Sequence, residues 1–273
     1  MRTVIGALRC GLMIIAMVIG FVLILLTGWM KFEIGGARLA GWIVTGLARF
    51  HNLIFGIRFR NPDAKKIREH QGFLFPNHTT YLDILVMLSV TPVRFLAEAG
   101  TKDRPLIGYF ASAIGSVFVD RSDRNSRQRA RQSIARRVRE NPFPPIVVFP
   151  EGRVNPGVLL MPFFRGAFEI SIENGIAYLP CAIRYSNPEI TTWGWKQQKD
   201  GPPIQIKEGI MTAIWRVATS PVPLRVELVA LDPILPKPED SAQTLSVECK
   251  HLLEAALGFE HSSDELPEVI NYG

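Results

Sequence analysis

Two apolar stretches occupy the first sixty residues, and the first of them predicts a membrane helix. Residues 10–30 hold no charged side chain, with the sequence CGLMIIAMVIGFVLILLTGWM, and Trp29 lies near the end of the run. As an α-helix this run would extend about 31 Å, which matches a hydrocarbon core of roughly 30 Å. A cleaved signal peptide would have a shorter apolar region and a small-residue cleavage site, which residues 27–32 do not offer. We therefore predict a retained membrane helix.

The second apolar stretch, residues 34–54, has helical spacing, and its placement is open. Its large apolar side chains recur every three or four residues, at Leu39, Trp42, Ile43, Leu47, Phe50 and Leu53. Arg38 and Arg49 fall together at one edge of that face. If the helix lies in the membrane interface, their guanidinium groups would reach lipid headgroups. The alternative is a helix that packs on the core of the folded domain.

From residue 72 onward, short apolar runs alternate with helical patterns. The runs that predict strands are 72–76, 93–97, 116–120, 146–150, 179–184 and 224–230. The patterns that predict helices are 81–90, 106–113, 126–140, 165–174 and 242–257. Gly175 would end the fourth helix, because glycine accepts the left-handed conformation that commonly follows a helix. The alternation predicts an α/β domain with a central, mostly parallel sheet flanked by helices, preceded by the N-terminal membrane helix or helices.

The chain accordingly divides into three parts. Residues 1–60 form a membrane anchor and interfacial helix, residues 61–258 a folded domain, and residues 259–273 a loosely held acidic tail.

Charge and cysteine content narrow the partners. The net charge is +6, which suits an anionic membrane surface or an anionic substrate. Nucleic acid is not expected as a partner, because no zinc-finger, helix-turn-helix or RNA-binding motif is present. The three cysteines, Cys10, Cys181 and Cys249, are far apart in sequence. They suggest neither a disulfide framework nor a metal site, so a reducing compartment is expected for the folded domain.

The first candidate for chemistry is the heptapeptide NHTTYLD at residues 77–83, which follows a predicted strand and opens a helix. On one continuous helix His78 and Asp83 would point about 140° apart. They can meet only if His78 lies in the turn and Asp83 in the first helical turn. Asp83 would then fix one imidazole nitrogen and leave the other free to take a proton from a hydroxyl. An alternative is structural, because Thr80 and Asp83 also fit a helix capping box.

Two further motifs follow later strands. In FPEGR, at residues 149–153, Glu151 has the chemistry to bind a glycerol hydroxyl and Arg153 a phosphate oxygen, while Gly152 permits a positive φ and close approach of a ligand. In GSVFVDR, at residues 115–121, Arg121 follows another strand and would converge on the same edge of the sheet. A turn with solvated charges is the alternative for FPEGR.

An arginine-rich helix follows GSVFVDR. Ala130, Ile134 and Val138 make a narrow apolar stripe, and the arginines of this region are Arg124, Arg127, Arg129, Arg131, Arg136, Arg137 and Arg139. Such a face suits anionic headgroups or the phosphates of a carrier, and a solvated helix surface is the alternative. The remaining histidines, His51, His70, His251 and His261, have no metal-spaced partner and are interpreted as surface or packing residues.

These motifs, in this order, resemble the glycerolipid acyltransferases, which include the lysophosphatidate acyltransferases. The pattern is His-x4-Asp after a strand, then G-x-x-F-V-x-R, F-P-E-G and a later L-P-C-A, over residues 77–183. Segments such as TKD at 101–103, FFRGAF at 163–168 and ITTWGW at 190–195 are most similar to the lysophosphatidylcholine acyltransferase branch.

The resemblance implies an enzyme that transfers a fatty acyl group from acyl-CoA, or from acyl carrier protein, to the free hydroxyl of a lysophospholipid such as lysophosphatidylcholine or lysophosphatidate. His78 would be the general base, with Asp83 as its partner. Arg121, Glu151, Gly152 and Arg153 would bind the acceptor. It implies no metal and no other cofactor. Membrane lipids would be partners, at a bacterial inner membrane or the endoplasmic reticulum, with the site facing the cytoplasm.

Two departures from the family pattern bear on the acceptor. Arg153 stands where the family usually has threonine, and Glu98 where a lysine is common. We expect this exchange to alter the phosphate pocket and to favour a zwitterionic lysolipid, whose cationic head Glu98 would meet. The alternative from a different class is a membrane-bound lipid-binding or scaffold protein without activity. No G-x-S-x-G, H-E-x-x-H or P-loop motif is present to suggest another enzyme class.

Overall fold

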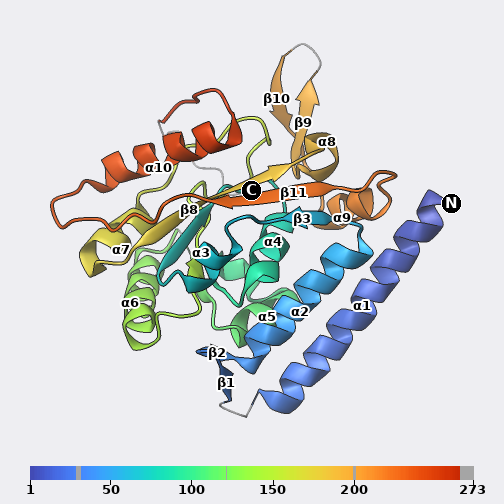
Figure 1. Cartoon of the computed structure of the whole chain (residues 1–273), viewed down its shortest axis with the longest axis horizontal. Coiled ribbons are helices and arrows are strands. Elements are labelled where there is room, and N and C mark those ends of the chain that lie inside the picture. Colours follow the sequence, from blue (N-terminus) through green and yellow to red (C-terminus); the bar gives the residue numbers. More distant parts are fainter. Residues whose placement is uncertain (29–31, 121, 199–200, 265–273) are drawn as a thin grey trace.

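A seven-stranded sheet with helices on both faces forms the centre of the molecule (Figure 1). The computed structural model describes residues 1–28, 32–120, 122–198 and 201–264. The strand order is β3-β11-β8-β4-β7-β5-β6. Strands β8, β4, β7, β5 and β6 run parallel to one another, and β11 pairs with β8 in the antiparallel sense. The prediction of an α/β domain with a mostly parallel sheet is therefore confirmed.

The sheet strands within the described residues are β3 (Arg58–Arg60), β4 (Phe73–Pro76), β5 (Arg94–Glu98), β6 (Val117–Val119), β7 (Ile146–Val147), β8 (Tyr178–Tyr185) and β11 (Arg225–Ala230). Two small hairpins lie outside it, β1 (Glu33–Ile34) with β2 (Ala37–Arg38) and β9 (Trp195–Gln198) with β10 (Gly201–Gln205). The helices are α1 (Arg2–Thr27), α2 (Leu39–Ile54), α3 (Ala64–Glu69), α4 (Leu82–Val90), the 3₁₀ turn η1 (Ala99–Thr101), α5 (Ile107–Ala113), α6 (Arg124–Glu140), α7 (Gly166–Asn174), α8 (Pro188–Thr191), α9 (Ile210–Ala218) and α10 (Ala242–Leu257).

Alternation along the strands divides the core into two layers. Leu74 and Val147 face one hydrophobic cluster, which also takes side chains from α2, α4, α5 and α9. Phe73, Phe75 and Ile146 face the other, which α6, α7 and α10 complete. Because successive side chains of a strand point to opposite faces, these strands bury both faces and read as continuous apolar runs.

All six predicted strands and all five helices predicted beyond residue 72 are present, with bounds within two residues except for β7, which ends at Val147, three residues before the predicted end. Gly175 follows α7 with φ 59° and ψ 37°, as predicted. The sequence patterns missed β3, α3, the β9–β10 hairpin and α9.

Helix α1 lies alongside the domain, next to α2 (Figure 1). It is the one helix of the described residues that is long and apolar enough to cross a membrane, and only 11% of its most apolar stretch is buried. Its N-terminal half rests on α9, where Arg9 Nη1 donates to the carbonyl of Ala218 at 2.8 Å. Gly20 lies against Leu47 of α2. An apolar N-terminal helix was predicted, and its exposed apolar face is the part available to lipid. Trp29 lies outside the described residues.

Helix α2 packs on α4, which agrees with the core-facing alternative. Its buried side includes Ala40, Val44 and Ala48, whereas Leu53, on the face predicted to be its main apolar face, is exposed. Arg49 does not project toward headgroups. Its guanidinium donates to the carbonyls of Ser89 and Val90 at the C-terminal end of α4, at 2.8 and 3.2 Å. The interfacial interpretation of Arg49 was wrong because unpaired carbonyls at a helix end attract a guanidinium.

A buried histidine on α2 predicts acid-sensitive stability. His51 is 3% exposed and stacks on Phe55 at 4.1 Å. Burial lowers the pKa of His51 to about 4, against a weaker opposing hydrogen bond from Asn52. The folded state therefore binds fewer protons than the unfolded chain between about pH 6.5 and 4, and stability falls as pH drops through that window. His51→Gln should abolish about 3 kcal/mol of this fall in unfolding experiments. An unchanged pH slope in the variant would contradict it.

The chain beyond α10 is held more firmly than predicted. Lys250, 1% exposed on its side chain, places Nζ 2.9 Å from Glu254 Oε1 and 2.8 Å from Asp264 Oδ1. His261 Nδ1 lies 2.8 Å from Glu254 Oε2, and His251 Nε2 lies 3.1 Å from Asp264 Oδ2. Residues 260–264 are thus tied to α10 and are not loose. The rest of the predicted acidic tail, residues 265–273, lies outside the described residues.

The same cluster changes how two histidines are interpreted. Potential ligand atoms of His251, Glu254 and His261 lie within 4.8 Å of one another, although the sequence spacing gave these histidines no metal partner. Both histidines are exposed, as predicted for surface residues. The Lys250 ammonium already pairs with both carboxylates, Glu254 and Asp264, so the cluster is accounted for as an ion-pair network.

Candidate active site

His78 lies in the turn between β4 and α4, at the carboxyl end of a central strand. Its backbone N–H donates to Glu151 Oε1 at 2.7 Å, and its carbonyl accepts from the backbone N–H of Asn155 at 2.6 Å. Its ring stacks on Phe149 with centroids 4.0 Å apart. The side chain is 16% exposed. Backbone and ring are therefore held on three sides before any contact with Asp83 is counted.

His78 and Asp83 meet as the sequence predicted, and Asp83 is held from four sides. His78 Nδ1 lies 2.9 Å from Asp83 Oδ2. The same oxygen accepts from the backbone N–H groups of Thr79 and Thr80, at 2.6 and 2.8 Å, and Oδ1 accepts from the Tyr185 hydroxyl at 2.5 Å. Asp83 is fully buried. Because a carboxylate only accepts, Nδ1 carries the proton and Nε2 presents its lone pair.

The capping alternative is half fulfilled. Asp83 reaches back to the Thr80 N–H, but the Thr80 hydroxyl is buried without a hydrogen-bond partner among the described residues. One carboxylate thus begins α4 and orients the imidazole. Nε2 of His78 has no hydrogen-bond partner among the residues that the structure describes.

Glu151 holds the His78 turn in place. It is fully buried, and its Oε1 accepts from the His78 N–H and from Asn155 Nδ2 at 2.9 Å. Its Oε2 accepts from the Met161 N–H at 2.8 Å. Burial raises the pKa of Glu151 to about 8, which these donors only partly offset. The geometry makes it a positioning residue in the absence of ligand. Its predicted contact with an acceptor hydroxyl stays a prediction.

Glu151→Gln should destabilise the protein even though the side chains have the same shape. A glutamine side chain has one acceptor oxygen. If that oxygen accepts from the His78 N–H and from Asn155 Nδ2, the NH₂ group faces the Met161 N–H. An unpaired buried donor of this kind costs about 1–3 kcal/mol. Chemical denaturation above about pH 8, where Glu151 is ionised and accepts with both oxygens, should show this loss, whereas Glu248→Gln, at an exposed position on α10, should leave stability unchanged. Equal stabilities would contradict the role of Glu151 as the anchor of the turn.

The sequence interpretation missed two asparagines and a tyrosine that support the site. Asn77 exchanges two hydrogen bonds with the backbone of Ile183, at 3.0 and 2.7 Å, and so continues the pairing of β4 with β8. Asn155 Oδ1 accepts from the Thr79 hydroxyl at 3.0 Å. Tyr185 comes from the far end of β8. Asn155 stands two residues beyond a motif already singled out, which was the only available signal for it. Nothing near Tyr185 in the sequence pointed to it.

The other predicted binding residues have mixed placements. Gly152 has φ 67°, the positive value expected of it. Arg153 is half-buried and makes no hydrogen bond or ion pair with another described residue. It is therefore available to an anionic ligand two residues beyond Glu151. Arg121 lies outside the described residues. Glu98 is exposed at the end of β5.

The fold is an α/β domain, and the His-x4-Asp turn follows its central strand β4. Residues 56–184, a little under half of the chain, match the family model described as Acyltransferase. The resemblance to glycerolipid acyltransferases is confirmed by named relatives.

These relatives come from two groups. The 1-acyl-sn-glycerol-3-phosphate acyltransferase of Neisseria meningitidis is 26% identical over 156 residues, 57% of this chain and 58% of that one. Human lysophospholipid acyltransferase LPCAT4 is 28% identical over 221 residues, 79% of this chain and 38% of that one. Danio rerio lysophosphatidylcholine acyltransferase 1 is 34% identical over 125 residues, 45% of this chain and 23% of that one. The matches therefore span at most 58% of the length of these relatives.

A solved structure agrees with the fold. The crystal structure of the 1-acyl-sn-glycerophosphate (LPA) acyltransferase PlsC from Thermotoga maritima superposes with a TM-score of 0.68 and covers 94% of this chain and 96% of that one. Sequence identity is 14%, so this likeness establishes the architecture alone.

Proposed function

We propose that this protein transfers an acyl group from a thioester, acyl-CoA or acyl carrier protein, to the free glycerol hydroxyl of a lysophospholipid. The observation that carries the proposal is the His78–Asp83 pair, with Nδ1 held at 2.9 Å from the carboxylate and Nε2 without a hydrogen-bond partner in the described part of the chain. A lipid hydroxyl is a poor nucleophile and a thioester is already electrophilic. A positioned base is therefore what the reaction needs from the protein.

Nε2 of His78 takes the proton from the acceptor hydroxyl as its oxygen attacks the thioester carbonyl carbon. The tetrahedral intermediate collapses with cleavage of the C–S bond, and the imidazolium returns its proton to the departing thiolate. Asp83 stays ionised and stabilises the imidazolium. No acyl-enzyme forms, and the protein uses no metal or other cofactor.

The acceptor would be held beside this pair by cations from the neighbouring loops. Arg153 is half-buried without a protein partner among the described residues, which supports contact with the acceptor phosphate. Arg121 and the backbone at Gly152 would complete this pocket, and Glu151 would fix the turn between them. The exposed apolar face of α1 would seat the protein on a membrane, at a bacterial inner membrane or the endoplasmic reticulum, with the site facing the cytoplasm.

A panel of acceptors with one labelled donor tests the proposal. Purified protein in mixed micelles is given labelled oleoyl-CoA, or the same acyl chain on acyl carrier protein, with lysophosphatidate or lysophosphatidylcholine. Labelled diacyl phospholipid should form with at least one acceptor. The Glu98→Lys variant in the same panel should shift preference toward lysophosphatidate; an unchanged preference would remove Glu98 from acceptor choice. Absence of product from every acceptor and both donors would favour a lipid-binding scaffold instead.

A further inference from the structure

A cavity of about 360 Å³ lies at the end of the sheet opposite His78. The His78 and Glu151 loops follow the carboxyl ends of β4 and β7. The cavity, in contrast, is lined by residues that precede β5, β6 and β7, by the β1–β2 hairpin and by the last turn of α6. It is thus separate from the His78 site and lies beside the β1–β2 hairpin that precedes α2.

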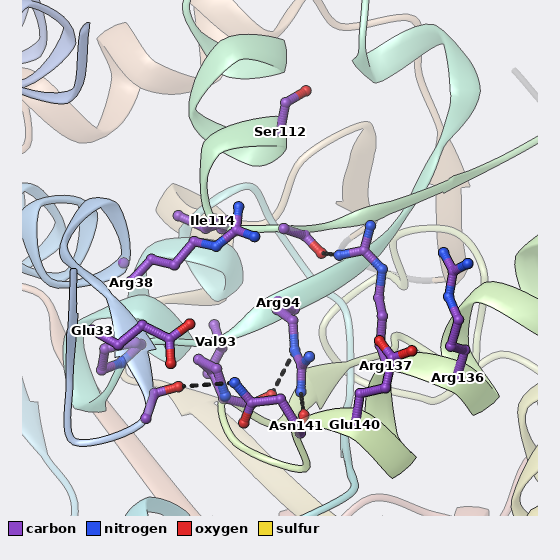
Figure 2. Close-up of a pocket in the computed structure, with 15 residues that line it drawn as sticks. Glu33, Arg38, Val93, Arg94, Ser112, Ile114, Arg136, Arg137, Glu140 and Asn141 are labelled. Carbon is purple, nitrogen blue, oxygen red and sulfur yellow. Dashed lines mark hydrogen bonds between the residues drawn. The ribbon is translucent and has the colours of Figure 1, made fainter. Parts of the chain in front are cut away.

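Four arginines from three elements line this cavity, which Figure 2 draws with the side chains of Arg38, Arg94 and Arg137 reaching into it from different sides. The charged lining residues are Arg38, Arg94, Arg136, Arg137, Glu33 and Glu140. Four cations against two carboxylates leave an excess of two positive charges. None of the four guanidinium groups lies within 4.0 Å of a carboxylate among the described residues.

The side chains of two of these arginines are fixed by hydrogen bonds to backbone carbonyls. Arg94, the first residue of β5 and 6% exposed, donates from Nε to the carbonyl of Pro144 at 2.7 Å and from Nη2 to that of Asn141 at 2.9 Å. Arg137 Nη1 donates to the carbonyl of Gly115 at 2.5 Å. Gly115 has φ 80°, and a Cβ there would lie 3.1 Å from that nitrogen. Arg137 Nε also donates to Ser133 Oγ at 3.3 Å, and the other N–H groups of both side chains have no hydrogen-bond partner among the described residues.

The guanidinium groups are close enough to repel one another. Burial and the charge of Arg137 lower the pKa of Arg94 to about 10. Burial lowers the pKa of Arg137 as well, with Arg136 and Arg38 adding to the effect. Both side chains keep their charge at neutral pH. Among the described residues, no carboxylate pairs with these guanidinium groups. An anion bound between them would therefore offset their repulsion.

The geometry points to a second ligand site in this cavity, for a phosphate group. Planar guanidinium forks match phosphate oxygens, and the fixed N–H groups of Arg94 and Arg137 supply the floor, with Arg38 and Arg136 at the sides. The phosphate can come from an anionic lipid headgroup or from a soluble phosphate ester. The hairpin supports the lipid: Phe32 and Ile34, 54% and 45% exposed, flank Glu33 and so add exposed apolar side chains next to a residue that lines the cavity. The inference does not rest on acyl transfer.

The test replaces the two cavity arginines whose side chains make no hydrogen bond with another described residue. The side chains of Arg38 and Arg136 are exposed and make no hydrogen bond with another described residue, so Arg38→Gln/Arg136→Gln leaves no carbonyl unpaired. The matched control is Arg124→Gln/Arg139→Gln, which removes the same charge from exposed positions on α6 outside the cavity. Flotation is measured with phosphatidylcholine vesicles that contain phosphatidate, or phosphatidylglycerol at equal charge. Thermal unfolding is measured with inorganic phosphate against chloride at equal ionic strength.

Two outcomes support the site and identify its source. For a lipid headgroup, phosphatidate vesicles should bind wild type and control about tenfold more tightly than phosphatidylglycerol vesicles, and the cavity variant should lose that preference. For a soluble phosphate, inorganic phosphate should raise the Tm of wild type and control but not of the cavity variant. If the cavity variant behaves as the control in both measurements, the site is refuted. Acyl transfer assays of the same variants report on the proposed function separately.

Discussion

Replacing His78 with alanine is expected to lower kcat for acyl transfer by about 10²–10⁴-fold, the range typical for loss of a positioned general base. The backbone of His78, which bonds to Glu151 and Asn155, stays in place in the variant. Folding should therefore change little. Only the stacking of the ring on Phe149 and the bond to Asp83 are lost.

The measurement is the initial rate of labelled phospholipid formation at saturating donor and acceptor. His251→Ala serves as the control, because it removes a partly exposed imidazole on α10. The control should keep the wild-type rate. A His78→Ala rate within a factor of a few of wild type, with folding intact, would exclude His78 as the base.

Asp83→Asn is expected to have a comparable effect for a different reason. The carboxylate accepts four hydrogen bonds, from His78, Tyr185 and the backbone of Thr79 and Thr80. An asparagine turns an NH₂ group toward at least one of these donors. If the NH₂ group faces Tyr185, whose hydroxyl can also accept, the oxygen still serves His78, Thr79 and Thr80, but the charge that stabilises the imidazolium is lost. If it faces the other three donors, it unseats the first turn of α4 or forces the imidazole into the other tautomer, with Nε2 protonated and unable to accept. We expect a loss of about 10²–10⁴-fold in kcat and about 1–3 kcal/mol in stability.

Tyr185→Phe is the comparison variant, because it separates effects on the orientation of the His78 imidazole from effects on folding. Tyr185→Phe removes one donor to Oδ1 but leaves the carboxylate and its bond to Nδ1. Its kcat should fall by about tenfold or less, since three donors remain. The pH–rate profile of each variant should be recorded, because only the loss of a basic imidazole removes the acid limb. An Asp83→Asn enzyme with wild-type kcat would contradict the role given to Asp83.

The sequence predicted the parts of the structure that depend on neighbouring residues. A strand that leads into an apolar helix placed His78 in a turn and Asp83 one helical turn later, and the two side chains meet there. The alternating apolar runs predicted the central strands, since each buries both faces and so reads as an unbroken hydrophobic segment. Local pattern was sufficient for both.

The parts that depend on long-range contact were not predicted. Tyr185 is 102 residues from Asp83 and is brought to it by the pairing of β8 beside β4. The face that α2 buries was misjudged, because small residues such as Ala40 and Ala48 allow close packing on α4 and hydropathy gives them little weight. Nothing in the spacing of Arg38, Arg94 and Arg137 indicated that they share a cavity, since they come from three separate elements.

In the proposed reaction the acyl group passes directly from thioester to lipid hydroxyl, with His78 as the base. A single-turnover experiment with protein in excess over labelled acyl thioester, with and without lysolipid acceptor, shows whether it does. We expect thiol release and labelled lipid in equal amounts only when acceptor is present, no label on the protein at any time, and neither product at a comparable rate with His78→Ala. Labelled protein that accumulates without acceptor, or lipid product that forms as fast without the imidazole, would contradict it.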